Sequence, residues 1–125
     1  MKPRENLVRL KQFKVNEKRR QLAQLDMMIA EFDRMAAELD VQIAAEERKA
    51  GITDVNHFAY PTFAKAARLR HDNLKNSQSD LILQKKTAET LLAEAEAELA
   101  KAEMLESRDT RHREPEPAIR SAMIG

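Results

Sequence analysis

The sequence has no cysteine and no tryptophan, and aromatic residues make up only 4% of its 125 positions. Without cysteine there is no disulfide framework and no thiolate chemistry, which suits a reducing compartment. So few aromatic side chains leave too little bulk for a thick globular core, but enough for the narrow contact between two helices. The expected fold is therefore thin and all-α.

Glycine and proline are also rare, with two glycines and four prolines in the whole chain. In the long middle part of the sequence the only ones are Gly51 and Pro61. Because these residue types interrupt helices, the sequence predicts two long helices with one break. The expected elements are helix one over about 3–50, a tip loop over 51–60 and helix two over about 61–107.

Long apolar runs are missing too. No run approaches the roughly 20 apolar residues that a membrane-spanning helix needs, so we expect no direct membrane insertion. The charged N-terminus is not followed by an apolar segment, so no secretory signal is predicted. The formal net charge is only +1, which argues against bulk attraction to nucleic acid or anionic lipid.

Charge is informative as a pattern along the chain. Residues 1–20 carry eight basic and two acidic side chains, a net +6, and residues 21–49 carry three and seven, a net −4. After the break, residues 61–86 carry a net +4 and residues 87–107 a net −5. If the chain folds back at the break, each block faces one of opposite sign, whereas in a parallel dimer each block faces itself. The pattern therefore predicts a long antiparallel two-helix coiled-coil hairpin within a single chain.

Helix one has a clear heptad pattern. With Val8 at position a, the a positions are all apolar: Val8, Val15, Leu22, Ile29, Ala36, Ile43 and Ala50. The d positions are Lys11, Lys18, Leu25, Phe32, Leu39 and Glu46. Such a sustained pattern predicts a seam, the strip of side chains along which two helices pack. The two lysines at d would meet themselves in a parallel dimer, but meet acidic residues of helix two in the hairpin.

Helix two has a weaker pattern. One series at heptad spacing is apolar throughout: Ala67, Leu74, Leu81, Ala88, Ala95 and Ala102. The sequence does not decide which second series of positions completes the seam. One assignment gives Phe63, Arg70, Ser77, Gln84, Leu91 and Glu98, and the other uses Leu92 and Leu99 instead. We expect the polar stretch around Ser77 to be the least stable part. A Ser77→Leu substitution should stabilise it if Ser77 faces the seam.

The C-terminal part of the sequence differs from the rest. Residues 108–125 are polar and are interrupted by Pro115 and Pro117. Such a composition cannot bury enough apolar surface to offset the entropy of ordering. We therefore predict a disordered tail over 108–125, after a coiled-coil domain over 1–107.

The sequence predicts no catalytic, metal-binding or cofactor site. The histidines, His57, His71 and His112, lie far apart and none has metal-ligand spacing to another. Two glycines do not make a phosphate-binding loop, and carboxylates on a thin, solvated fold stay hydrated. The basic N-terminal block has only Phe13 for base stacking and faces acidic residues in the hairpin, so nucleic acid is not an expected partner.

Three of the five aromatic residues, Phe58, Tyr60 and Phe63, lie together at the break. They either cover the end of the seam or bind a partner, because aromatic residues are frequent among interface hot spots. The two interpretations are compatible, since one ring can cover the seam while another faces solvent.

Two stretches of the sequence resemble a known family. They are MKPRENLVRLKQFKVNEKRRQLAQLDMMIAEF at the N-terminus and GITDVNHFAYPTFAKAARLRHDNL from the loop into helix two. Both resemble the flagellar export protein FliJ in its alphaproteobacterial form, and the likeness covers roughly residues 1–107. The resemblance implies a non-enzymatic protein of the flagellar type III export apparatus, needed for flagellum assembly, motility and chemotaxis. It implies a cytoplasmic location, peripheral at the inner membrane through the apparatus.

The resemblance also implies a fold and partners. FliJ proteins form an antiparallel two-helix coiled coil similar to the central stalk of rotary ATPases. Their partners are the export ATPase hexamer, the cytoplasmic domain of the export gate, and the export chaperones. The alternative to this interpretation is a structural or nucleic-acid-binding coiled-coil arm of another assembly.

Candidate contact residues follow from the resemblance. The family's gate-binding surface has an aromatic residue followed by Leu, Ala and His at steps of four, three and four. In this chain the pattern falls on Tyr60, Ala64, Ala67 and His71, with alanine in place of leucine. Together with Phe58 and Phe63 they form the predicted gate-binding tip. Tyr60→Ala and His71→Ala should weaken binding without loss of helicity, because we expect both side chains to lie outside the seam. We place the ATPase contact near the free helix ends, with Arg9, Lys14 and Glu103 as candidates.

Overall fold

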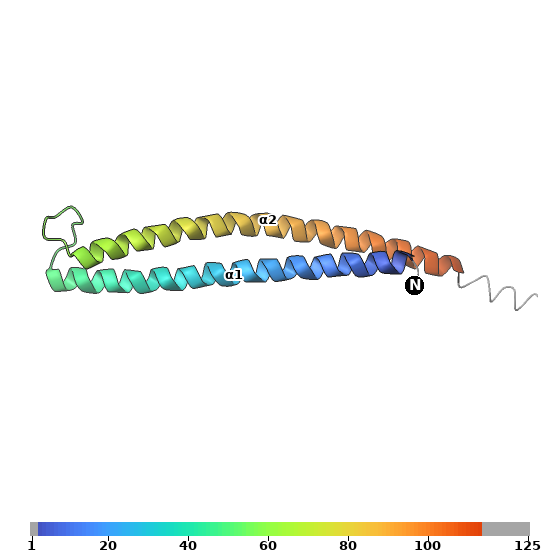
Figure 1. Cartoon of the computed structure of the whole chain (residues 1–125), viewed down its shortest axis with the longest axis horizontal. Coiled ribbons are helices and arrows are strands. Elements are labelled where there is room, and N and C mark those ends of the chain that lie inside the picture. Colours follow the sequence, from blue (N-terminus) through green and yellow to red (C-terminus); the bar gives the residue numbers. More distant parts are fainter. Residues whose placement is uncertain (1–2, 114–125) are drawn as a thin grey trace, which may run out of the picture. The chain divides into compact units, whose positions relative to one another are not determined.

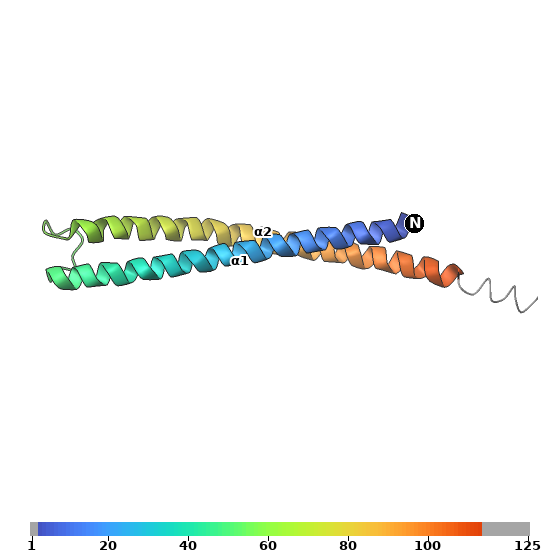
Figure 2. The same ribbon diagram turned by 60° about the horizontal axis from the view of Figure 1, so that its bottom comes forward.

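The computed structural model describes residues 3–113, which form two long helices (Figure 1). Helix α1 spans Pro3–Ala50 and helix α2 spans Thr62–Arg113. The helices run antiparallel and pack against each other (Figure 2), so the predicted hairpin is confirmed. Contacts divide the chain into an end unit, Met1–Leu22 with Ala88–Gly125, and a tip unit, Ala23–Thr87.

The bounds of α1 agree with the sequence, and its ends show why. Pro3 and Glu5 lie in the first turn, and Arg48 and Lys49 lie in the last. Proline is preorganised for the first turn of a helix, where its missing N–H costs nothing. An acidic residue at the start and basic residues at the end both complement the helix dipole. The ends of α1 are therefore encoded locally.

Gly51 ends α1 in a left-handed conformation, with φ at 71°. Its N–H donates to the Glu47 carbonyl oxygen at 2.8 Å, which satisfies a carbonyl of the last helical turn. A Cβ added at Gly51 would meet no atom within 4 Å, so space is available there. The requirement for glycine therefore comes from the backbone angle alone.

A Gly51→Ala substitution is expected to lower the free energy of unfolding by about 1 kcal/mol, because L-residues resist the left-handed region. Urea unfolding followed by circular dichroism measures the change. Gly51→Asn is the matched control, since asparagine adopts this conformation more readily and should lose less. Equal losses in both variants would show that the backbone angle is not the cause.

Helix α2 is longer than the sequence predicts. The expected end at residue 107 is wrong, because the helix continues through Arg113. Arg4 of α1 supports the added turns, with its Nη1 3.0 Å from Asp109 Oδ1. Asp109 thus has a partner on the other helix, which the polar composition of this stretch did not indicate. The rest of the predicted tail, residues 114–125, lies outside the described residues.

The loop between the helices is closed by short-range hydrogen bonds. The His57 N–H donates to the Asp54 carbonyl at 3.1 Å, and the Tyr60 N–H to the His57 carbonyl at 3.0 Å. The Asp54 carboxylate accepts from the Asn56 N–H, and His57 Nδ1 accepts from the Ala59 N–H, both at 3.0 Å. These turns satisfy backbone groups locally and set the directions of the tip aromatics.

The apolar centre of the tip unit is a small cluster. Leu39 and Ile43 of α1 pack with Ala67 of α2, and the partly buried Leu74 packs against them. Alanine at 67 lets the helix backbones approach closely, so the two large side chains of α1 fill the space between them. This cluster confirms the predicted seam beside the tip.

The heptad assignment of α1 is confirmed apart from its last member. Val15, Ala36, Leu39 and Ile43 are buried, and the other a and d residues are half-buried except Ala50. Ala50 is exposed where the helix ends. The regular apolar a positions therefore identified the packed side of α1.

On α2 the series from Ala67 to Ala102 is buried or half-buried at every member, as predicted. The second seam series of α2 is shifted by one residue from the predicted assignment that starts at Phe63. The seam contains Ala64, His71, Gln78, Lys85, Leu92 and Leu99, whereas Phe63, Arg70, Ser77, Gln84, Leu91 and Glu98 are exposed. Ser77 faces solvent, so the condition under which Ser77→Leu was expected to stabilise the seam is not met.

Gln78 takes the seam position expected of Ser77. Its Nε2 donates to the Ile29 carbonyl at 3.1 Å and to Asp33 Oδ1 at 2.6 Å. Its Oε1 accepts from Lys75 Nζ at 3.3 Å. No buried side-chain nitrogen or oxygen in the described part of the chain lacks a partner. The predicted weak stretch is therefore a satisfied polar contact, which offsets the cost of burying the amide.

Four carboxylates at heptad spacing follow one side of α1 in the tip unit: Asp26, Asp33, Asp40 and Glu47. We call them the acidic ladder. Each contacts a polar side chain of α2: Lys85 at 2.7 Å, Lys75 at 3.5 Å, His71 at 3.1 Å and Arg68 at 2.8 Å, in the same order. The ladder realises the charge complementarity that the sequence blocks predict.

The end unit pairs basic α1 with acidic α2. Its cross-helix ion pairs are Arg4–Asp109 at 3.0 Å, Lys11–Glu98 at 2.8 Å and Arg19–Glu96 at 3.4 Å. Lys11, at a d position, thus meets an acidic residue as the hairpin requires. Over residues 3–113, neither helix holds an apolar stretch of the length needed to cross a bilayer.

Candidate partner-binding tip

Tyr60 is the buried aromatic residue of the tip, with 7% of its surface exposed. Its hydroxyl donates to Glu47 Oε2 at 2.9 Å and accepts from Arg68 Nε at 2.8 Å. Arg68 Nη2 lies 2.8 Å from the same Glu47 oxygen. The Arg68 guanidinium also lies 6.0 Å from the centre of the Tyr60 ring. This cluster ties the loop to the last turns of α1 and the first turns of α2.

The cluster also affects ionisation. The hydrogen bond from Arg68, followed by that from Tyr60, holds the pKa of the Glu47 carboxyl below its ordinary value of 4.5. The bond to Glu47, followed by that to Tyr60, raises the pKa of Arg68. Elsewhere, the bond from Gln78 lowers the pKa of Asp33, and the bond from Lys11 lowers that of Glu98.

Stability is expected to fall as the pH drops below about 4.5, the ordinary pKa of Glu47 and Glu98. A carboxyl whose pKa is lowered by folding stabilises the protein above its unfolded pKa and loses this effect as the pH falls through its folded pKa. Thermal unfolding in steps from pH 7 to pH 2 measures the change. Glu47→Gln should flatten the profile. Parallel profiles for Glu47→Gln and the wild type would contradict this account.

The other two tip aromatics face solvent. Phe58 is 95% exposed and Phe63 is 56% exposed. The Phe58 ring stacks on His57, with ring centres 4.7 Å apart. One aromatic residue therefore covers the seam while two stay outside, so the two interpretations of the tip combine.

A shallow groove adjoins Phe58. Two neighbouring clefts of about 370 and 600 Å³ share Val55, Thr62 and Lys65 in their lining, with Phe58 in the first and Leu69 in the second. We call these five residues the tip groove. Its apolar side chains project from both the loop and α2, and Lys65 adds a positive charge. Such a surface can hold an apolar side chain of a partner next to a carboxylate.

The residues carried over from the family pattern lie elsewhere. Ala64 and Ala67 are buried in the seam, so a partner of the folded hairpin does not reach their side chains. His71 is half-buried, with Nε2 3.1 Å from Asp40 and Nδ1 3.5 Å from Asp72. The expectation that Tyr60 and His71 lie outside the seam is therefore wrong. Steps of four, three and four are heptad spacing, and here they follow the seam side of α2.

The candidates for the ATPase contact lie in the end unit. Arg9, Lys14 and Glu103 are all exposed. Lys14 is close enough to Glu98 to contribute to the lowered pKa of that carboxyl. These side chains are thus accessible, as a contact requires.

Sequence reasoning missed Val55, Lys65 and Leu69 as part of a surface. A signal was present, because Leu69 lies off both α2 seam series and therefore had to face outward. Among residues 3–113, no group of three or more His, Cys, Asp or Glu side chains is placed to hold a metal ion. Compared with known protein families, curated proteins and solved structures, the chain matches none.

Proposed function

We propose that this chain is a FliJ-like, non-enzymatic component of the flagellar type III export apparatus. In this role it acts as a stalk-like coiled coil that couples the export ATPase hexamer to the cytoplasmic domain of the export gate, and it assists export chaperones. It would work in the cytoplasm, peripheral at the inner membrane through the apparatus, during flagellum assembly. The main support is the antiparallel hairpin whose loop exposes Phe58 beside the tip groove, together with the sequence resemblance.

A coupling role requires two contact surfaces, and each unit exposes side chains that can form one. The tip unit exposes aromatic and aliphatic side chains around Phe58 and Leu69. The end unit exposes charged side chains, including Arg9, Lys14 and Glu103. Apolar aromatic anchors favour a tight contact, whereas exposed charges mainly affect the association rate and its salt dependence. These surfaces are consistent with a gate contact at the tip and an ATPase contact at the end, where apolar side chains, including Phe13 and Met104, are exposed as well.

A nucleic-acid-binding arm has less support. Arg4, Lys11 and Arg19 of the basic block each pair with a carboxylate of α2. Paired cations neutralise fewer phosphates, so the electrostatic contribution to nucleic-acid binding is reduced. A structural arm of another assembly is the alternative. Neighbouring genes distinguish the two, because an adjacent flagellar ATPase gene supports the export role.

Phe58→Ala is expected to weaken binding to the gate's cytoplasmic domain by at least about tenfold, as loss of an aromatic hot spot does. Isothermal titration calorimetry with the full chain measures the affinity. Phe58 suits this test better than Tyr60, because its ring lies outside the seam and stacks on the neighbouring loop residue His57. Motility of cells carrying the variant should fall while the protein stays abundant.

Phe13→Ala is the matched control, since Phe13 is an exposed phenylalanine of the end unit. It should leave gate affinity unchanged. Circular dichroism confirms that both variants keep their helicity. Unchanged affinity for Phe58→Ala, with normal binding by the wild type, would exclude the tip groove as the gate contact. Absence of wild-type binding to either the gate or the ATPase would contradict the export role itself.

A further inference from the structure

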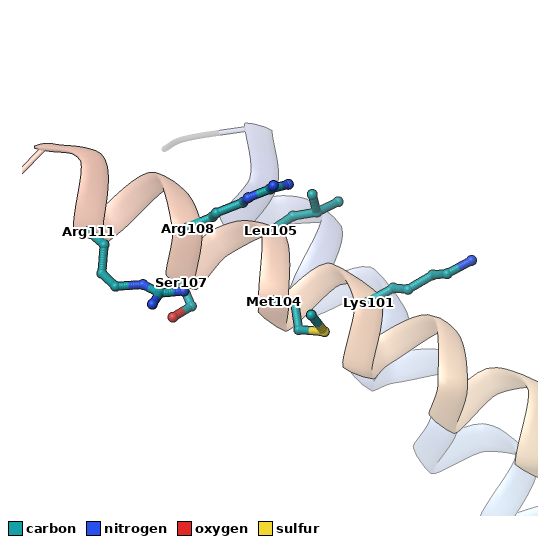
Figure 3. Close-up of a pocket in the computed structure, with 6 residues that line it drawn as sticks. All are labelled: Lys101, Met104, Leu105, Ser107, Arg108 and Arg111. Atoms are coloured by element: carbon teal, nitrogen blue, oxygen red, sulfur yellow. The ribbon is translucent and has the colours of Figure 1, made fainter.

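The tip groove differs from the groove along the last turns of α2 in what forms its walls. The residues that line the groove of α2, among them Met104 and Leu105, all belong to that one helix (Figure 3). The cleft beside Phe58 has one wall from the loop, at Val55 and Phe58, and one from α2, at Lys65. A helix wall is held by its own backbone hydrogen bonds, whereas a loop wall has to be held by other contacts. The shape of the tip groove therefore depends on what fixes the loop.

Burial shows where the loop is attached to the helices. Residues 53–59 are all exposed, Ile52 is half-buried, and Tyr60 is buried. The Tyr60 hydroxyl donates to Glu47 Oε2 of α1 at 2.9 Å and accepts from Arg68 Nε of α2 at 2.8 Å. We call Tyr60, Glu47 and Arg68 the clasp. It joins the loop to both helices, at the end of the loop that adjoins α2.

The Phe58 ring is supported from within the loop. It is almost fully exposed, and it stacks on His57 with the two ring planes 23° apart. The His57 carbonyl accepts from the Tyr60 N–H at 3.0 Å, and His57 Nδ1 accepts from the Ala59 N–H at 3.0 Å. A continuous set of contacts thus runs from the clasp through His57 to Phe58, as coupling between two sites requires.

We propose that the clasp positions the loop wall of the tip groove and thereby controls binding at this groove. The proposal rests on the proposed function, because it takes the tip groove as the gate contact. Tyr60 and Glu47 are positioning residues, which act through Phe58 rather than by touching the partner. An intact clasp keeps the loop in the conformation that forms the cleft with Lys65. A broken clasp makes this conformation one of several, and the affinity falls with its population.

A nitroxide spin label in the loop measures this positioning without any partner. The chain has no cysteine, so Asn56→Cys gives a single labelling site in the exposed part of the loop. Tyr60→Phe keeps the ring and removes the hydroxyl, and it should increase the mobility of the label. A label at Met104, an exposed site on the groove of α2, is the control and should not respond.

Val15→Ala is the control for a general loss of stability, because Val15 is fully buried in the end unit. It should lower the stability of the chain but leave the mobility of the label at position 56 unchanged. A greater mobility in this variant, equal to that in Tyr60→Phe, would assign the effect to stability and overturn the proposal.

Calorimetry with the full chain and the gate's cytoplasmic domain then measures the effect on binding. Tyr60→Phe should weaken the affinity by about fivefold, the equivalent of one hydrogen bond, and Val15→Ala should bind like the wild type. In a Phe58→Ala background, the same Tyr60→Phe substitution should weaken binding by less than about twofold, because the side chain that it positions is gone. A purely structural role of Tyr60 would give equal losses in both backgrounds.

Two further results would overturn the positioning role of the clasp. One is an unchanged mobility of the loop label in Tyr60→Phe. The other is an equal loss of affinity on Tyr60→Phe with and without Phe58. Absence of gate binding by the wild type would contradict the proposed function instead, and the mobility of the loop label would then decide the positioning role by itself.

Discussion

Tyr60→Ala is expected to lower the free energy of unfolding by about 3 kcal/mol, as truncation of a buried aromatic residue does. Tyr60 is 7% exposed and holds Glu47 and Arg68 through its hydroxyl. The substitution removes the ring and leaves the other two residues to pair without it. Urea unfolding of the full chain, followed by circular dichroism, measures the loss.

Two variants separate the parts of this effect. Tyr60→Phe keeps the ring but removes the hydroxyl, so it should cost about 1 kcal/mol, the usual value of a hydrogen bond. Phe58→Ala truncates an exposed ring and should change stability by less than about 0.5 kcal/mol. If Tyr60→Ala costs no more than Phe58→Ala, Tyr60 is not buried in solution and is again available to a partner.

Leu39→Ala is the second large effect, with an expected loss of about 2–3 kcal/mol. Leu39 is 6% exposed and belongs to the cluster with Ile43 and Ala67. Truncation leaves a cavity next to an alanine of α2, and alanine is too short to fill it. The loss should appear as a lower midpoint of urea unfolding with an unchanged slope.

Val41→Ala is the matched control for Leu39, because it lies two residues away on α1 and is 68% exposed. It should change the free energy of unfolding by less than about 0.5 kcal/mol. Similar losses at both positions would mean that the heptad assignment of α1 is wrong. A loss at Leu39 alone supports the seam as described.

The fold was largely predictable because it depends on repeated signals. Every a position of helix one is apolar, and the only interior glycine lies where α1 ends. The second seam series of α2 was harder, since its middle members are His71, Gln78 and Lys85. Polar residues in a seam give no hydrophobic signal. Their positions depend on partners across the seam, which lie far away in the sequence.

The candidate site was predicted only in part. The sequence indicated that one of the tip aromatics covers the seam while another faces solvent. It did not show which residue is buried and which is exposed. Tyr60 is buried because Glu47 and Arg68, distant in sequence, satisfy its hydroxyl. Phe has no such group to anchor it, and Phe58 lies outside. The end of α2 was predicted too early for the same reason, because the ion pair between Asp109 and Arg4 exists only in the folded hairpin.

The even spacing of the acidic ladder has a consequence for the alignment of the two helices. If α2 slid by one heptad so that His71 moved to Glu47, then Gln78 would meet Asp40 and Lys85 would meet Asp33. His71, Gln78 and Lys85 would each still find a carboxylate, although Arg68 would lose Glu47 and Asp26 would face Leu92. The three middle contacts of the ladder by themselves therefore barely distinguish one alignment from the next. The choice is made where the pattern is not repeated, at the Leu39 cluster and at Tyr60. The Leu39 cluster and Tyr60 therefore fix the alignment of the two helices within the tip unit. Substitutions that weaken these contacts would make neighbouring alignments nearly equal in energy.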